Sequence, residues 1–233
     1  MTRTKKIIKK KLKKPDEFIS FTEKGFIYIT HHSKSIATGG AIVLILLLFI
    51  FFYQRWEKEN EENAYQMFSL ALETYQITSV PSQEGSLQNY KNVLEKFNEV
   101  VTKFPNTLSG KLSMLYKGNL CLRIGEFEEA IKAYEAFLQK AGKEKLYCSF
   151  AMEGLGYSYE GKKDYEKAIN AYQKNIGSGE NFQIGNAYLG MGRCYEKLGK
   201  NKETLENYKN FLKVSRKSSM TNIILKKLSY LEK

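Results

Sequence analysis

The chain reads GNLCLRIGEFEEAIKAYEAFL from Gly118 to Leu138, and its arrangement of small and aromatic residues returns twice towards the C-terminus. In each copy a glycine is followed twelve residues later by alanine or threonine, and a tyrosine comes four residues after that. The three sets are Gly118, Ala130 and Tyr134; Gly156, Ala168 and Tyr172; and Gly192, Thr204 and Tyr208. The copies recur after 38 and 36 residues, a period that indicates an array of repeats.

The residue types in this pattern are those that two helices need when they fold back on each other. Glycine in the first helix and alanine in the second let the backbones approach closely, and the tyrosine one turn later packs across the pair. Gly125 and Gly199 fall between the helices, where a left-handed residue ends the first one, and Lys163 holds this place in the second copy. Gly161 is expected at an exposed helix end. The pattern therefore predicts an all-α array of helical hairpins.

This pattern resembles the tetratricopeptide repeat. The first stretch and GLGYSYEGKKDYEKAINAYQ, residues 154–173, match the signature of that family closely. The third copy, GMGRCYEKLGKNKETLENYKNFL at residues 190–212, departs at Asn201, where an aromatic residue is usual, and at Thr204, where alanine is usual. The resemblance implies a helical-hairpin solenoid that binds other proteins.

A fourth, degenerate unit precedes the three clear copies, and a cap helix follows them. We expect the two helices of this unit at Glu62–Gln76 and Ser86–Lys103. The predicted repeat domain covers residues 57–233, with repeats at about 62–106, 111–144, 149–182 and 185–218 and a cap helix at 220–232. The apolar residues expected to close the array from the cap are Ile223, Ile224, Leu228 and Leu231.

A membrane-spanning helix is predicted before the repeats. Twenty uncharged residues lie between Lys34 and Arg55, and twenty helical residues rise about 30 Å, the thickness of the bilayer core. The stretch is apolar on all sides, which argues against an amphipathic core helix. It has no following small-x-small site, which argues against a cleaved signal peptide. We therefore assign residues 35–56 to a single transmembrane helix, with Tyr53 and Trp56 at the membrane interface.

The N-terminal tail, residues 1–34, is strongly basic. Residues 1–35 carry ten Lys/Arg and three Asp/Glu, which gives this stretch +7 of the total net charge of +12. We expect an amphipathic juxtamembrane helix within residues 15–34 and anionic lipid against the lysine run, although residues 1–14 equally suit a disordered tail. The positive-inside rule places the N-terminus in the cytoplasm and the repeat domain in the periplasm of a bacterial inner membrane.

Anchor and repeats together resemble a bacterial family of single-pass inner-membrane proteins with a periplasmic tetratricopeptide domain, which includes the ancillary subunit of the Sec translocon. The shared layout is the segment DEFISFTEKGF at residues 16–26 with HHSK at residues 31–34, then the anchor, then the array. The resemblance implies an interaction scaffold in protein translocation or envelope assembly. The alternatives are a lipid- or nucleic-acid-binding protein acting through the basic tail, and a structural envelope protein that self-associates.

First helices of successive repeats line a groove in such arrays, and the partner-binding residues are expected there. Projection places in it Leu112, Leu115, Asn119, Leu122, Phe150, Glu153, Tyr157, Glu160, Leu189 and Arg193, with Glu196 beside them. This set is apolar at one end and charged at the other, which suits an amphipathic helix or an extended segment of a partner protein. The alternative is that its apolar members are ordinary core between repeats.

Catalysis has no support in the sequence. No Ser/His/Asp or Cys/His set, P-loop or dinucleotide motif is present, and the part after the anchor contains no histidine. Cys121, Cys148 and Cys194 are widely spaced and suit small buried apolar side chains. We therefore predict that the protein is not an enzyme and uses no cofactor and no metal ion.

Overall fold

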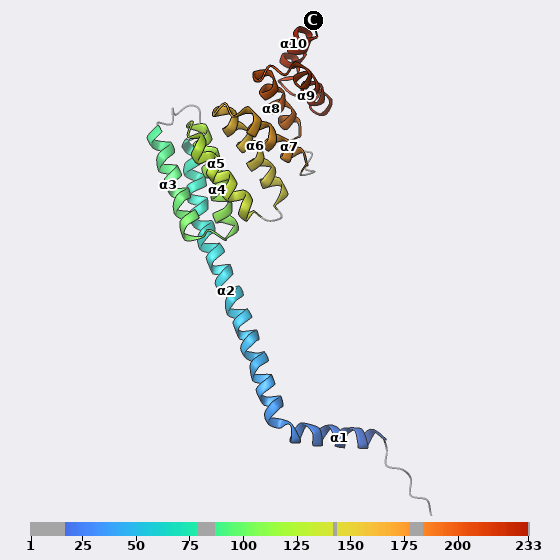
Figure 1. The fold of residues 1–233 in the computed structure, drawn as a ribbon. Coiled ribbons are helices and arrows are strands. Elements are labelled where there is room, and N and C mark those ends of the chain that lie inside the picture. The colour runs from blue at the N-terminus through green and yellow to red at the C-terminus, as the bar shows by residue number, and fades with distance from the viewer. Residues whose placement is uncertain (1–16, 79–86, 142–143, 178–183, 233) are drawn as a thin grey trace, which may run out of the picture. The chain divides into compact units, whose positions relative to one another are not determined.

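The structure is a computed structural model and describes residues 17–78, 87–141, 144–177 and 184–232. Within these ranges the regular secondary structure is entirely helical (Figure 1). The helices are α1 (Glu17–His31), α2 (Ser33–Thr78), α3 (Leu87–Lys103), α4 (Leu108–Arg123), α5 (Phe127–Lys140), α6 (Lys145–Gly161), α7 (Tyr165–Gly177), α8 (Ile184–Lys197), α9 (Asn201–Val214) and α10 (Thr221–Leu231). The chain divides into two units, residues 1–57 and 58–233.

The first unit contains α1 and the apolar part of α2. Phe26, Ile27 and Tyr28 of α1 are exposed. Helix α2 includes an 18-residue stretch with a mean hydropathy of 2.6, of which no part is buried within the chain. By length and composition α2 can therefore cross a membrane, and its apolar stretch is not a core helix of the described protein.

The second unit is a stack of helices in which each element from α3 to α10 contacts the next one along the chain. Helices α4 and α5, α6 and α7, and α8 and α9 form the hairpins of the three sequence repeats. The first helices of the hairpins also contact each other, α4 with α6 and α6 with α8. The predicted solenoid of helical hairpins is confirmed.

The core of each hairpin is a tyrosine whose ring lies against glycine. Tyr134, Tyr172 and Tyr208 are completely buried. A Cβ atom on Gly156 would lie 2.3 Å from Cε1 of Tyr172, and one on Gly192 would lie 2.4 Å from Cδ1 of Tyr208. The glycines of the repeat pattern are therefore required by the rings of the tyrosines in the same repeat.

The following repeat supplies a second glycine to two of these tyrosines. A Cβ atom on Gly154 would lie 2.3 Å from Cζ of Tyr134, and one on Gly190 would lie 2.4 Å from Cζ of Tyr172. Each of these rings is thus clasped between a glycine of its own hairpin and a glycine of the next one. The interaction joins neighbouring repeats as well as the two helices of one repeat.

The turns between the paired helices confirm the left-handed residues that the sequence predicts. Gly125 has a φ angle of 81° and Gly199 one of 68°. Lys163 takes the same place between α6 and α7 with a φ angle of 63°. A residue with a Cβ atom is disfavoured in this left-handed region, so the conformation of Lys163 costs free energy that glycine at this position would not cost.

Both ends of the array are closed by contacts between elements. At the C-terminal end, Ile224 and Leu228 of α10 are buried in a cluster with Tyr208 and Phe211. Ile223, which we expected in this contact, is 49% exposed because it lies on the solvent side of α10. The apolar face of α10 that covers the array therefore includes fewer residues than the sequence pattern indicated.

At the other end, the carboxylate of Glu61 in α2 caps the N-terminus of α4. It accepts hydrogen bonds from the backbone N–H of Leu108 at 2.7 Å and of Ser109 at 3.0 Å, and from the Ser109 hydroxyl at 2.8 Å. A negative charge at a helix N-terminus satisfies free N–H groups and interacts favourably with the helix dipole. Glu61 therefore fixes where α4 begins relative to the C-terminal part of α2.

From its place at an exposed helix end we expected Gly161 to tolerate bulk better than Gly156, and the structure contradicts this expectation. Gly161 ends α6 and is exposed as expected, but a Cβ atom there would lie 2.4 Å from Cε1 of Phe127, which comes from α5. This contact between repeats means that Gly161 does not tolerate bulk freely. Gly177, at the end of α7, is the open position, since a Cβ atom there meets nothing within 4 Å.

Replacing Gly156 by leucine should destabilise the domain because the new side chain collides with the buried Tyr172 ring. Overpacking of this kind costs about 1–3 kcal/mol. Gly177→Leu is the matched control and should change stability little. Thermal denaturation of both variants checks the prediction, and equal melting temperatures would contradict the packing of Tyr172 described above.

Replacing Lys163 by glycine should stabilise the domain because it removes a Cβ atom from a left-handed position. After allowance for the greater freedom of glycine in the unfolded chain, the expected gain is about 1 kcal/mol. Urea denaturation measures this gain. Lys163→Ala, which removes the charge but keeps the Cβ atom, is the control and should give no stabilisation. A gain of similar size with alanine would show that charge, not backbone conformation, is responsible.

Candidate groove between the first helices

A cavity of about 430 Å³ lies between α4 and α6, and we refer to it as the groove pocket. Its lining residues come from two first helices and one second helix: Leu115, Tyr116, Asn119 and Leu122 of α4, Tyr134 of α5, and Tyr147, Phe150, Glu153, Gly154 and Tyr157 of α6. The sequence interpretation named Leu115, Asn119, Leu122, Phe150, Glu153 and Tyr157 among them. It missed Tyr116, Tyr134, Tyr147 and Gly154.

The structure places the apolar members of the predicted set at different depths. Leu115 is 4% exposed and Leu189 is 7% exposed, so both belong to the core, the reading that the sequence left open. Leu122 and Phe150 are only partly buried and pack against the cluster around Tyr134. Leu112 packs instead against the cluster of Phe68 and Phe97 near the start of the array.

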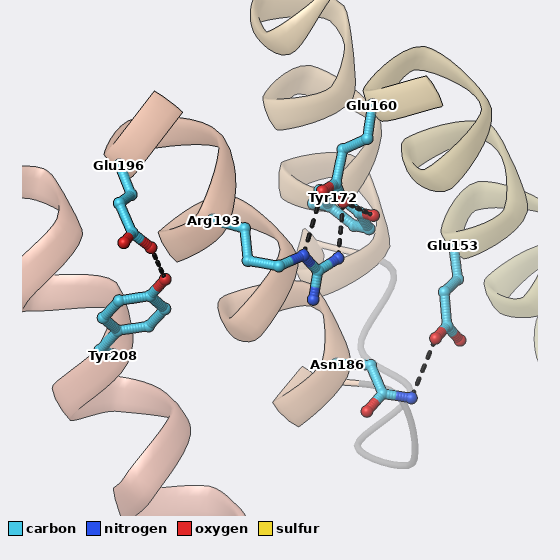
Figure 2. A network of polar contacts seen from close by, with 7 residues as sticks. All are labelled: Glu153, Glu160, Tyr172, Asn186, Arg193, Glu196 and Tyr208. Carbon is cyan, nitrogen blue, oxygen red and sulfur yellow. Dashed lines mark hydrogen bonds and ion pairs between the residues drawn. The ribbon is translucent and has the colours of Figure 1, made fainter. Parts of the chain in front are cut away.

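Glu160 is the centre of a polar network that joins the second and third repeats (Figure 2). Its carboxylate accepts a hydrogen bond from the Tyr172 hydroxyl at 2.6 Å. It also accepts two from the Arg193 guanidinium, from Nε at 3.0 Å and from Nη2 at 2.6 Å. This two-pronged ion pair runs from α6 to α8 and is partly buried, which makes it stronger than a surface pair.

A similar arrangement recurs one repeat later at Glu196, whose contact with Tyr208 is drawn in Figure 2. Its carboxylate accepts a hydrogen bond from the Tyr208 hydroxyl at 2.5 Å and is paired with the Lys227 ammonium of α10, with Nζ–O distances of 2.8 and 2.6 Å. In both cases one carboxylate links the tyrosine of its own hairpin to a cation of the next element. The glycine-clasped tyrosines therefore also orient the charges on the face of the first helices.

The first repeat lacks this arrangement. By the 38-residue offset, Leu122 occupies the position of Glu160, and the Tyr134 hydroxyl donates to Asn119 Oδ1 at 2.7 Å instead. By the 36-residue offset, Tyr157 occupies the position of Arg193. Glu160 and Arg193 form an ion pair between α6 and α8. The equivalent residues between α4 and α6 are Leu122 and Tyr157, and both line the groove pocket.

Burial and charge set the protonation of the network. Burial, and then the adjacent Glu160, raise the pKa of Tyr172 far above its ordinary value, so the phenol stays a neutral donor. Although burial opposes it, hydrogen bonding to Lys227 and Tyr208 lowers the pKa of Glu196. Burial raises the pKa of Glu153 despite hydrogen bonds from Asn186 and Tyr157. These carboxylates therefore differ in how well their surroundings support a negative charge.

The buried cysteines of the first helices are not reactive thiols. Burial raises the pKa of the Cys121 thiol to about 11 and that of Cys194 to about 12, so neither is a thiolate near neutral pH. The described part of the chain contains no group of three or more His, Cys, Asp or Glu residues that could hold a metal ion. The chemistry available at the groove pocket is apolar contact, hydrogen bonding and charge.

Stacked helical hairpins whose first helices form a face with a groove are the architecture of solenoid repeat proteins, which use such surfaces for binding. The profile of the tetratricopeptide repeat-like domain family matches residues 28–233, and the chain belongs to this family. Proteins of this fold typically serve as non-catalytic scaffolds for interactions between proteins. No curated protein matches the sequence.

Solved structures with the same fold include MamA and a second bacterial repeat protein. MamA from Desulfovibrio magneticus RS-1, residues 41 to the end, is 18% identical with a TM-score of 0.53 over 67% of this chain and 77% of that one. Another MamA structure is 22% identical with a TM-score of 0.54 over 69% and 77%. A tetratricopeptide repeat protein from Parabacteroides merdae is 18% identical with a TM-score of 0.56 over 72% and 60%. At these identities the likeness is one of fold.

Proposed function

We propose that this protein is a membrane-anchored scaffold that binds a segment of another protein in the groove pocket, outside the cytoplasm, in protein translocation or envelope assembly. The observation that carries the proposal is the groove pocket itself. Its volume of about 430 Å³ is within the range of ligand-binding clefts. It combines partly exposed apolar side chains, Leu122 and Phe150, with polar groups on Asn119 and Glu153.

The shape of the lining suits a peptide segment better than a small molecule. The pocket lies along the contact between two helices, and its lining places the carboxylate of Glu153 among apolar and aromatic side chains. Side chains of an extended or helical segment can alternate between these two environments. The charged groups of the next repeats, Glu160 and Arg193, continue the same face and provide further polar contacts for a longer segment.

The membrane part of the proposal rests on α2. Its 18-residue apolar stretch is unburied within the chain, so it needs an apolar environment from elsewhere. The Lys/Arg-rich sequence before it and the glutamates after it, of which Glu61 serves α4, favour an N-terminus in the cytoplasm. The first 16 residues, on which the lipid- or nucleic-acid-binding alternative depends, lie outside the described residues.

A reporter enzyme that is active only outside the cytoplasm should be active when it is fused after Lys233. The physical reason is the charge difference across the apolar stretch, which orients single-span proteins. A second fusion, of a fluorescent protein that matures only in the cytoplasm, is the control and should be dark. Activity of the cytoplasmic reporter alone would overturn the proposed location.

A photo-crosslinking amino acid at Phe150 should join the protein to its partner in intact cells. Phe150 lines the groove pocket, whereas Gln173 of α7 is exposed and is not among the pocket's lining residues, so Gln173 is the control position. The expected result is a discrete product from Phe150 that is absent from Gln173, detected by immunoblotting and identified by mass spectrometry. Identical products from both positions would contradict binding in the groove pocket.

A further inference from the structure

Glu153 is the unusual residue of the groove pocket. By the repeat offsets it occupies the position held by Leu115 in the first repeat and Leu189 in the third, both of which are core residues. Here the position carries a carboxylate that faces the pocket and accepts a hydrogen bond from Asn186 Nδ2 at 2.9 Å (Figure 2). The repeat fold does not require a charge at this place, since leucine fills it twice.

Glu153 also differs from the other carboxylates on this face. Glu160 is paired with Arg193, and Glu196 is paired with Lys227. Among the residues that the structure describes, no ion pair involves Glu153, and the nearby Arg193 is already held by both oxygens of Glu160. Hydrogen bonds from Asn186 and Tyr157 therefore orient Glu153, and Arg193 acts on it through its charge while it is paired with Glu160.

The environment of this carboxylate favours an incoming positive charge. Burial against the pocket raises the pKa of Glu153, which means that its negative form is poorly solvated. A cation placed beside it would offset that cost, because opposite charges attract more strongly where water is partly excluded. The lining of the pocket contains no lysine or arginine, and Arg193, whose charge also acts on Glu153, is paired with Glu160, so an acidic side chain or a terminal carboxylate is disfavoured beside Glu153.

We propose that the groove pocket selects partner segments in which an aliphatic or aromatic side chain is followed closely by lysine or arginine. The apolar side chain packs on Phe150, and the cation pairs with Glu153, which lies one turn further along the same face of α6. This inference rests on the proposed function, because it names the chemistry of the segment that the scaffold binds.

A peptide selection followed by a charge cycle tests the inference. The full-length protein in detergent micelles is used to select binders from a phage library of random peptides of about twelve residues, and the enriched peptides are measured by fluorescence polarisation. We expect them to combine an apolar residue with a nearby Lys or Arg. Replacing that basic residue by alanine should weaken binding to the natural protein by about tenfold and binding to Glu153→Gln by less than about threefold.

Glu153→Gln keeps an oxygen that can accept the hydrogen bond from Asn186, so the fold of the variant should be intact, and a melting curve verifies this. The matched control is Glu135→Gln, which removes a charge from the cavity formed by α5, α6 and α7 and should leave the tenfold effect unchanged. A basic residue that matters equally in the natural protein and in Glu153→Gln would overturn the inference.

The outcomes also separate this inference from the proposed function. Peptides that lose binding with Phe150→Ala but carry no conserved basic residue would overturn the inference and leave groove binding standing. Failure to enrich any peptide, or binding that is indifferent to Phe150→Ala, would overturn both. Leu122→Ala provides a second groove variant, and a melting curve is measured for both variants because both side chains also pack against the core.

Discussion

The structure depends on one packing interaction, a tyrosine ring held between two glycines. Tyr172 is completely buried, and Gly156 of its own hairpin and Gly190 of the next leave its ring the space it needs. The apolar surface of the ring drives burial, and its rigid shape admits only backbone on either side. A single side chain therefore sets the distance within a hairpin and the distance between hairpins, which is why the array can extend by repetition.

The hydroxyl of the same tyrosine connects this packing to the face formed by the first helices. A buried phenol needs an acceptor, and Glu160 supplies it while it also binds Arg193 of the next repeat. Tyr134 finds Asn119 of α4 instead, so the acceptor at this junction is an uncharged amide that does not bind a cation from α6. The contact of the tyrosine ring with a glycine of its own hairpin is the same in each repeat, and the partner of the hydroxyl decides whether a junction is closed by an ion pair.

Contacts within one hairpin could be predicted from the sequence, whereas contacts between hairpins largely could not. The repeat period identifies Gly156 and its tyrosine because both belong to the same copy. It does not identify Gly190 as a partner of Tyr172, although the spacing Gly190-Met-Gly192 was the available signal. Gly161 was misjudged for the same reason, since the ring that meets it belongs to Phe127 of the preceding repeat. The repeat period aligns equivalent residues of the copies, but it does not show which residue of one copy contacts which residue of the next.

The groove pocket lies where the repeat fold leaves the choice of side chain open. The tyrosine and glycine positions are fixed by packing, but the outer positions of the first helices vary between leucine, asparagine, tyrosine and charge without loss of the fold. Between α6 and α8 these positions hold Glu160 and Arg193, which bind each other. Between α4 and α6 the same positions hold Leu122 and Tyr157, which form no ion pair, and both line the pocket. The binding that we propose therefore lies at the junction where these two positions do not pair with each other, and Glu153 gives that junction its charge.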